Sequence, residues 1–137
     1  MSALRRDLGI PIAADESVRS LQDAKDIARQ EAADFINIKI TKCGLLHAIE
    51  IATFARSIGL RLMAGGMVET RIAMGCTFAL VLGLGGFELL DLDTPLLLAT
   101  DPVKGGYLYT GSMLQPCTGA GLDLHVEPSR ETFVFES

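Results

Sequence analysis

Hydrophobic and polar residues follow two different periods along most of the chain. Over residues 35–41, isoleucines lie on one face while Phe35, Asn37 and Lys39 share the other, which is the period of a β-strand. Over residues 21–32, apolar side chains recur every three or four positions, which indicates an amphipathic helix. Because the two periods follow each other repeatedly, the pattern predicts strands and helices in alternation.

The predicted elements fall into a regular part and an irregular part. The regular part consists of helices over residues 2–8, 21–32, 45–58 and 70–84, and strands over residues 10–14, 35–40, 60–64 and 87–90. After Pro95 the pattern changes, and glycine-rich turns separate short strands or irregular returns over residues 96–98, 106–110 and 122–126. From Pro128 onward we expect a loose tail.

Strands and helices that alternate at this length are typical of parallel βαβ units, so the predicted fold class is α/β. Four such units are too few for a complete (β/α)8 barrel, which needs about 250 residues. A small open sheet is the other arrangement that four parallel strands allow. The sequence has neither a GxGxxG after the first predicted strand nor a GxxxxGK[ST], so it does not indicate a nucleotide-binding loop.

Composition narrows the class of protein further. The 137 residues suffice for one domain, and a net charge of −5 without a basic patch argues against a nucleic-acid partner. The longest apolar run, residues 76–84, is too short to span a bilayer, and no leader peptide is recognisable, so we expect no membrane association. Three scattered cysteines, Cys43, Cys76 and Cys117, predict reduced thiols and a cytoplasmic location.

Candidate chemistry lies where the predicted strands end. Asp15 follows the first strand, Lys39 lies late in the second, Glu69 follows the third, and Asp91 and Asp93 follow the fourth. Parallel strands deliver these side chains to one edge of the sheet. Taken singly, each has a plainer explanation, such as an exposed strand lysine or an acid at a helix start. Two carboxylates on one face repel each other unless a metal ion or a substrate ammonium lies between them.

Four of these segments together resemble the enolase superfamily. They are DES at residues 15–17, Lys39 within INIKITKCG, the loop at residues 66–70, and DLDTP at residues 91–95. Within the superfamily they resemble the muconate-lactonizing subgroup, and most closely the dipeptide epimerases. The resemblance runs from Ile10 to Leu124. It implies a partial (β/α)8 TIM-type barrel, about strands five to eight, over residues 1–95, with a β-rich segment over residues 96–137 that packs back towards a capping domain.

The same resemblance implies roles for individual residues. Asp15 matches the third of three carboxylates that hold Mg²⁺ in these enzymes. Lys39 matches one of two lysines that remove and return a proton at the substrate α-carbon, through a metal-stabilised enediolate. Asp91 and Asp93 match the pair that binds the α-ammonium of a dipeptide, and the loop at residues 66–70 adds Met67 and Glu69 as substrate-binding residues. Lys42, placed on the opposite face by strict alternation, receives a structural or supporting role.

The family's other two carboxylates, its second lysine in a KxK motif and its capping domain belong to segments upstream of the matching region. We therefore expect the C-terminal part of a Mg²⁺-dependent dipeptide epimerase that is inactive alone. It would act with the missing N-terminal half or a second copy, and we expect a homo-oligomer. One alternative is a non-catalytic half-barrel that oligomerises through its strand edges. Another is a cycloisomerase or o-succinylbenzoate synthase, which the Asp91 and Asp93 pair disfavours because those substrates carry no ammonium.

Overall fold

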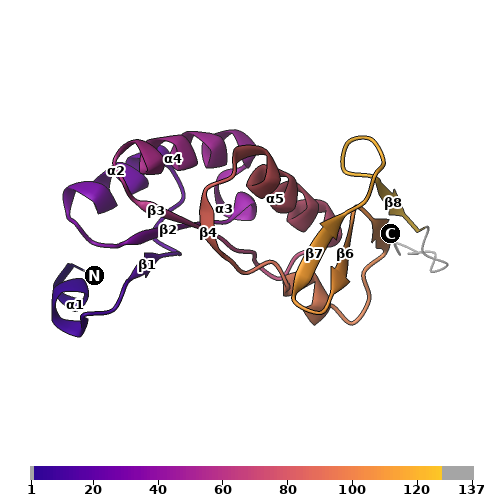
Figure 1. Ribbon diagram of the computed structural model, residues 1–137, viewed down its shortest axis with the longest axis horizontal. Helices are drawn as coiled ribbons and strands as arrows, with labels where there is room; N and C mark the ends of the chain where they lie inside the picture. The colour runs from indigo at the N-terminus through magenta and orange to yellow at the C-terminus, as the bar shows by residue number, and fades with distance from the viewer. Residues whose placement is uncertain (1, 128–137) are drawn as a thin grey trace, which may run out of the picture.

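A parallel sheet is the frame of the first 90 residues in the computed structural model, which describes residues 2–127 (Figure 1). Within the described residues its four strands lie in the order of the chain, β1-β2-β3-β4. They are β1 (Ala13–Ala14), β2 (Phe35–Ile38), β3 (Arg61–Ala64) and β4 (Phe87–Leu90). The predicted α/β class with a parallel sheet is confirmed.

Helices connect successive strands, as the alternating periods predicted. The connecting helices are α2 (Leu21–Arg29), α3 (Ile40–Cys43), α4 (Leu45–Ser57) and α5 (Arg71–Leu84), and α1 (Ser2–Leu8) precedes β1. Figure 1 shows α2 and α4 side by side along the sheet, and the two helices are in contact. The helix α2 begins where the sequence predicted, because the Ser20 hydroxyl accepts a hydrogen bond from the backbone N–H of Asp23 at 3.2 Å.

The isoleucine face of β2 forms the centre of the main core. Ile36 and Ile38 are fully buried and pack with residues of α2, α4 and β3, including Ile51 and Leu62. The opposite face of β2 is also covered, since Phe35 and Asn37 are buried. Both faces of this strand are therefore removed from water, as in other parallel α/β sheets.

The chain after β4 forms two small antiparallel sheets beside α5 (Figure 1). The 3₁₀ helix η1 (Thr94–Leu97) precedes them; β5 (Val103–Gly105) pairs with β8 (Leu124–Val126), and β6 (Tyr107–Thr110) pairs with β7 (Met113–Pro116). Tyr107 is buried edge-on against Phe78 of α5, and the Tyr109 hydroxyl donates to the Leu92 carbonyl at 2.6 Å. These contacts fix the C-terminal segment to the end of β4.

Three element predictions need correction or comment. The second strand ends at Ile38, and residues 40–43 form α3 instead of continuing it. Residues 96–98, expected as a short strand or an irregular return, form no strand, because η1 extends to Leu97 and Pro95 at its first positions favours a helical turn. The strands β5 and β7 were not predicted, and the expected tail from residue 128 lies outside the described residues. The division of the chain at residue 95 stays a prediction.

No helix in residues 2–127 has the length and hydrophobicity needed to cross a bilayer.

We expect Ile36→Ala to lower the free energy of unfolding by about 2–5 kcal/mol, because Ile36 is 0% exposed at the centre of the core. Leu46→Ala is the control, since Leu46 is 76% exposed on α4 and its truncation leaves no cavity. Urea unfolding followed by circular dichroism measures both. Equal losses for the two variants would contradict the described packing of β2.

Candidate active site

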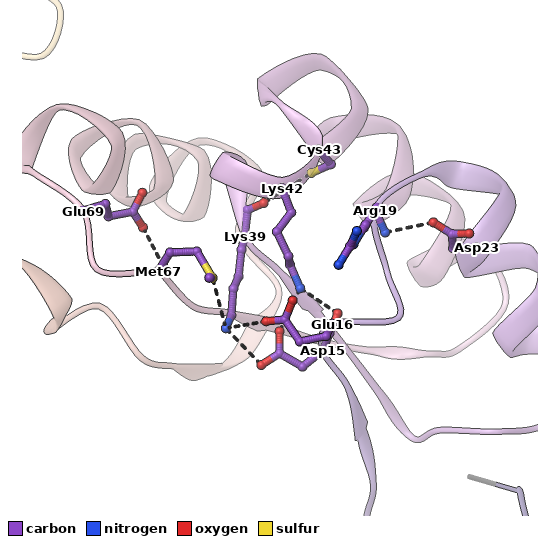
Figure 2. A network of polar contacts seen from close by, with 9 residues as sticks. All are labelled: Asp15, Glu16, Arg19, Asp23, Lys39, Lys42, Cys43, Met67 and Glu69. Carbon is purple, nitrogen blue, oxygen red and sulfur yellow. Dashed lines mark hydrogen bonds and ion pairs between the residues drawn. The ribbon is translucent and has the colours of Figure 1, made fainter.

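The C-terminal ends of β1 and β2 bring Asp15 and Lys39 together. The two strands pair in register, Ala14 opposite Ile36, so the residues that follow them emerge at the same edge of the sheet. The Lys39 ammonium lies 3.0 Å from Asp15 Oδ2 and 3.6 Å from Glu16 Oε1 (Figure 2). Two of the residues that the sequence placed at this edge are thus in direct contact.

Lys42 reaches the same carboxylate, contrary to the alternation argument. Because the strand ends at Ile38, Lys39 is the N-cap of α3 and Lys42 lies within α3, one turn further on, so strand alternation does not set the direction of Lys42. Lys42 Nζ donates to Asp15 Oδ1 at 2.8 Å and to the Asp15 carbonyl at 2.6 Å, and its side chain is only 7% exposed. The spacing of three between the lysines would have revealed this arrangement, had a helix been predicted there.

Electrostatics hold this cluster in its charged form. Burial raises the pKa of Asp15, but the hydrogen bonds and charges of Lys42 and Lys39 outweigh it, so the pKa is lowered. Burial lowers the pKa of Lys39, but Asp15 and Glu16 outweigh it, so the pKa is raised. Lys39 is therefore an ammonium at neutral pH, able to donate a proton to a group placed beside it.

The loop after β3 covers Lys39 from another direction. Met67 Sδ lies 3.9 Å from Lys39 Nζ, and the Met67 backbone N–H donates to Glu69 Oε1 at 3.2 Å (Figure 2). Met67 is partly exposed, whereas Glu69 is 8% exposed. Burial raises the pKa of Glu69, and the Met67 N–H and the Lys39 charge only partly offset this. Met67 thus faces the open side of the site, and Glu69 lies beneath it.

Asp91 and Asp93 follow β4 and complete the edge. The backbone N–H of Asp91 donates to the Ala64 carbonyl at 2.9 Å, which continues the β3–β4 pairing. The pKa of Asp91 is raised, first by burial and then by the neighbouring Asp93 carboxyl group. The Asp15 charge adds to this rise, and the Lys39 charge opposes it. The two carboxyl groups are therefore adjacent, and they lie within the electrostatic reach of Lys39 and Asp15.

The described residues do not form a metal site by themselves. Within residues 2–127, no group of three His, Cys, Asp or Glu side chains converges on one point. Asp15 supplies a single carboxylate, and both of its oxygens contact lysine ammonium groups. Since Mg²⁺ requires about six oxygen ligands, this carboxylate is at most one member of a larger set.

This fold and this arrangement of strand-end residues define a class of protein. The chain belongs to the enolase C-terminal domain-like family, whose sequence pattern matches residues 1–130. The resemblance seen in the sequence is thereby confirmed.

Individual relatives are dipeptide epimerases or members of the same superfamily. An L-Ala-D/L-amino acid epimerase from Populus trichocarpa is 54% identical over 105 residues, 77% of this chain and 25% of the relative. A mandelate racemase/muconate lactonizing protein from Herpetosiphon aurantiacus has a solved structure with a TM-score of 0.88 and 41% identity, over 93% of this chain and 36% of that one. A dipeptide epimerase from Methylococcus capsulatus, solved with Mg and the dipeptide L-Arg-D-Lys, has a TM-score of 0.77 and 38% identity, over 82% and 32%. The chain thus spans about a third or less of these proteins.

We expect Asp15→Asn to destabilise the fold most at intermediate pH. The pKa of Asp15 is lower in the folded chain than its ordinary value of 3.8. The ion pairs of Asp15 therefore stabilise the fold at a pH above 3.8, and this contribution is lost as the pH falls through the folded-state pKa. The pKa of Lys39 is higher in the folded chain than its ordinary value of 10.5. The ion pairs of Lys39 therefore stabilise the fold at a pH below 10.5, and this contribution is lost as the pH rises through the folded-state pKa. Because Asp15 is 39% exposed, the difference at neutral pH should be about 1–2 kcal/mol.

Urea unfolding of both proteins at a series of pH values measures this difference. It should be largest between about pH 5 and pH 9 and shrink beyond both limits. A difference that does not vary with pH would contradict the ion pairs at Asp15.

Proposed function

We propose that this chain supplies the C-terminal share of a Mg²⁺-dependent dipeptide epimerase active site, as strands five to eight of a (β/α)8 barrel. The observation that supports this most strongly is the contact between Lys39 and Asp15 at the edge of a parallel sheet that also carries Asp91 and Asp93. Those positions suit proton transfer at a carbon atom held beside an ammonium-binding pair. The names of the relatives give the substrate class, a dipeptide.

In this proposal Lys39 is the catalytic residue on one face of the substrate. Its ammonium is partly shielded from water between Asp15 and Met67, and it would deliver a proton to the α-carbon. Removal of a proton by the same residue requires the amine form, which the contacts with Asp15 and Glu16 disfavour. A second acid or base on the opposite face is needed for epimerisation, and we assign it to a segment outside residues 2–127.

Asp91 and Asp93 are proposed to bind the substrate's α-ammonium. Burial and the neighbouring Asp93 carboxyl group raise the pKa of Asp91, so a second negative charge at this position is costly, and a bound cation would relieve that repulsion. Met67 and Glu69 complete the substrate-binding group: Met67 faces the site, and Glu69 supports the Met67 backbone. The pair would therefore select dipeptides with a free amino terminus.

Asp15 is proposed as one ligand of a Mg²⁺ ion, with the other carboxylates supplied from outside the described residues. The relative from Methylococcus capsulatus supports this proposal because it was solved with Mg. A carboxylate is the hard oxygen donor that Mg²⁺ prefers, and the ion would share its oxygens with the two lysine ammonium groups that contact them.

The completing segment is proposed to be an N-terminal half of the barrel or a second copy of the chain. Leu89 and Leu90 of β4 are exposed, and β4 pairs only with β3 in the described sheet. An unpaired strand with exposed leucines favours association, which also supports the alternative of a non-catalytic homo-oligomer. The thiols of the three cysteines are free, which suits the cytoplasmic location that we propose.

Complementation tests the proposed reaction. We expect no epimerisation of L-Ala-L-Glu by this chain alone with Mg²⁺, and clear turnover when it is co-expressed with the segment of the Populus relative that precedes the matched region. Lys39→Met should then lower the rate by at least about 10³-fold, because the proton donor is lost. Lys25→Met, on the exposed face of α2, is the matched control. Turnover by the chain alone, or an active Lys39→Met complex, would contradict the proposal.

Blocking the amino terminus of the substrate tests the aspartate pair. In the complemented enzyme we expect L-Ala-L-Glu to react at least about a hundredfold faster than its N-acetyl derivative, because two adjacent carboxylates attract a cationic ammonium and not a neutral amide. Asp93→Asn should remove most of this preference, while Asp7→Asn on α1 should keep it. The kcat/KM ratio of the two substrates is the measurement. A preference that survives Asp93→Asn would refute the assigned role.

A further inference from the structure

The backbone between the two proposed ammonium-binding aspartates is held by a side chain of the C-terminal segment. The Tyr109 hydroxyl on β6 donates a hydrogen bond to the carbonyl of Leu92 at 2.6 Å, although Tyr109 lies 17 residues further along the chain. Burial is the largest cause of a raised Tyr109 pKa, so the phenol remains a donor at neutral pH. The bond therefore reaches the one residue that joins Asp91 to Asp93.

The Leu92 side chain is held as well. It is 6% exposed and packs in a second core cluster that includes Met74 of α5 and Tyr107 of β6. With its side chain buried and its carbonyl hydrogen-bonded, Leu92 cannot rotate without losing one of these contacts. Because Asp91 and Asp93 are bonded directly to Leu92, such a rotation would move both carboxyl groups.

The Tyr109 hydroxyl is itself presented by a packed framework. The Tyr109 ring lies edge-on against the Tyr107 ring, with 5.5 Å between the ring centres, and Tyr107 lies edge-on against Phe78 of α5. The Arg71 guanidinium, at the start of α5, lies 4.8 Å from the centre of the Tyr107 ring. It also donates hydrogen bonds to the carbonyls of Gly105 and Tyr107 at 3.0 Å and 2.7 Å. The helix α5 thus holds β6 in place, and β6 directs the hydroxyl at Leu92.

We propose that Tyr109 is a positioning residue for the ammonium-binding pair: through the Leu92 carbonyl it holds Asp91 and Asp93 at the spacing that suits a substrate ammonium. The inference rests on the proposed function of the pair, and it makes the C-terminal segment part of the site. Two neighbouring carboxylates that are free to move separate, because their charges repel each other. A displacement of about 1 Å in a group that orients a substrate is enough to reduce a rate about a hundredfold.

Titration of the Asp91 carboxyl group in the 137-residue chain, followed by ¹³C NMR, tests this role without any catalytic activity. Tyr109→Phe removes the hydroxyl and keeps the ring. We expect the pKa of Asp91 to fall towards its ordinary value of 3.8, with a rise of at least about threefold in its acid dissociation constant, since the pair separates.

Tyr107→Phe is the matched control for this titration. The Tyr107 hydroxyl lies on the same strand but has no hydrogen-bond partner among the described residues, so its removal should leave the pKa of Asp91 unchanged. Thermal unfolding of both variants shows how far each hydroxyl supports the fold. A Tyr109→Phe chain with a lower Tm and the Asp91 pKa of the wild type would overturn the proposal, because the bond would then serve stability alone.

Kinetics of the complemented enzyme at pH 8 give the functional part of the test. Tyr109→Phe should raise the KM for L-Ala-L-Glu about tenfold, with kcat within about threefold of the wild type, and lower the preference over the N-acetyl derivative about tenfold. Replacement of Tyr109 by p-aminophenylalanine, which keeps an N–H donor at the same position, should restore both values. Tyr107→Phe should change neither value.

A Tyr109→Phe enzyme with the KM and the substrate preference of the wild type would overturn the positioning role. The NMR titration decides whether Tyr109 sets the aspartate pair even if no epimerase is formed. Failure of this inference and failure of the proposed function therefore give different results.

Discussion

One carboxylate that holds two lysines is the interaction on which this site depends. The side chains of Lys39 and Lys42 are 11% and 7% exposed, and each would be costly to bury without a partner. Asp15 compensates both charges, one with each of its oxygens. It does so only because β1 and β2 run parallel and in register, so that they end at the same edge of the sheet. The stability of the edge and the charge state of the proposed catalytic lysine therefore have the same origin.

In this sheet, the residues within the strands form the core, and the residues that follow the strands form the candidate site. Along β2, Ile36 and Ile38 pack against the helices, and the chain then leaves the strand at Lys39, where side chains reach the edge. The edge is shared by all the strands, so residues far apart in sequence, such as Asp15 and Asp91, influence each other's charge. The loop that carries Met67 and Glu69 closes the edge between them. This arrangement explains how a chain that spans about a third of its relatives brings several residues of the proposed active site to one edge.

Much of this arrangement was readable in the sequence, because it follows from local periods. Alternation identified the buried isoleucines, and the rule that parallel strands end at one edge brought Asp15 and Lys39 together. Lys42 was misplaced because its direction depends on where β2 ends and α3 begins, which alternation does not determine. The β6–β7 hairpin was missed although its two-residue turn, Gly111-Ser112, is a local signal. The pairing of β5 with β8 and the burial of Glu69 depend on contacts across the fold, and no local pattern reports them. The roles of the site residues stay predictions.

The most direct test of this account is the titration of the Lys39 ammonium by NMR, with its Nζ labelled by ¹⁵N. In the wild-type chain we expect its pKa to lie above the ordinary value of 10.5, because Asp15 and Glu16 outweigh the effect of burial. In Asp15→Asn the pKa should fall clearly, since burial then acts against fewer negative charges. A Lys39 ammonium that titrates at the ordinary value in both proteins would show that Asp15 does not pair with it. That result would contradict the claim that the shared edge of β1 and β2 sets the charge state of Lys39.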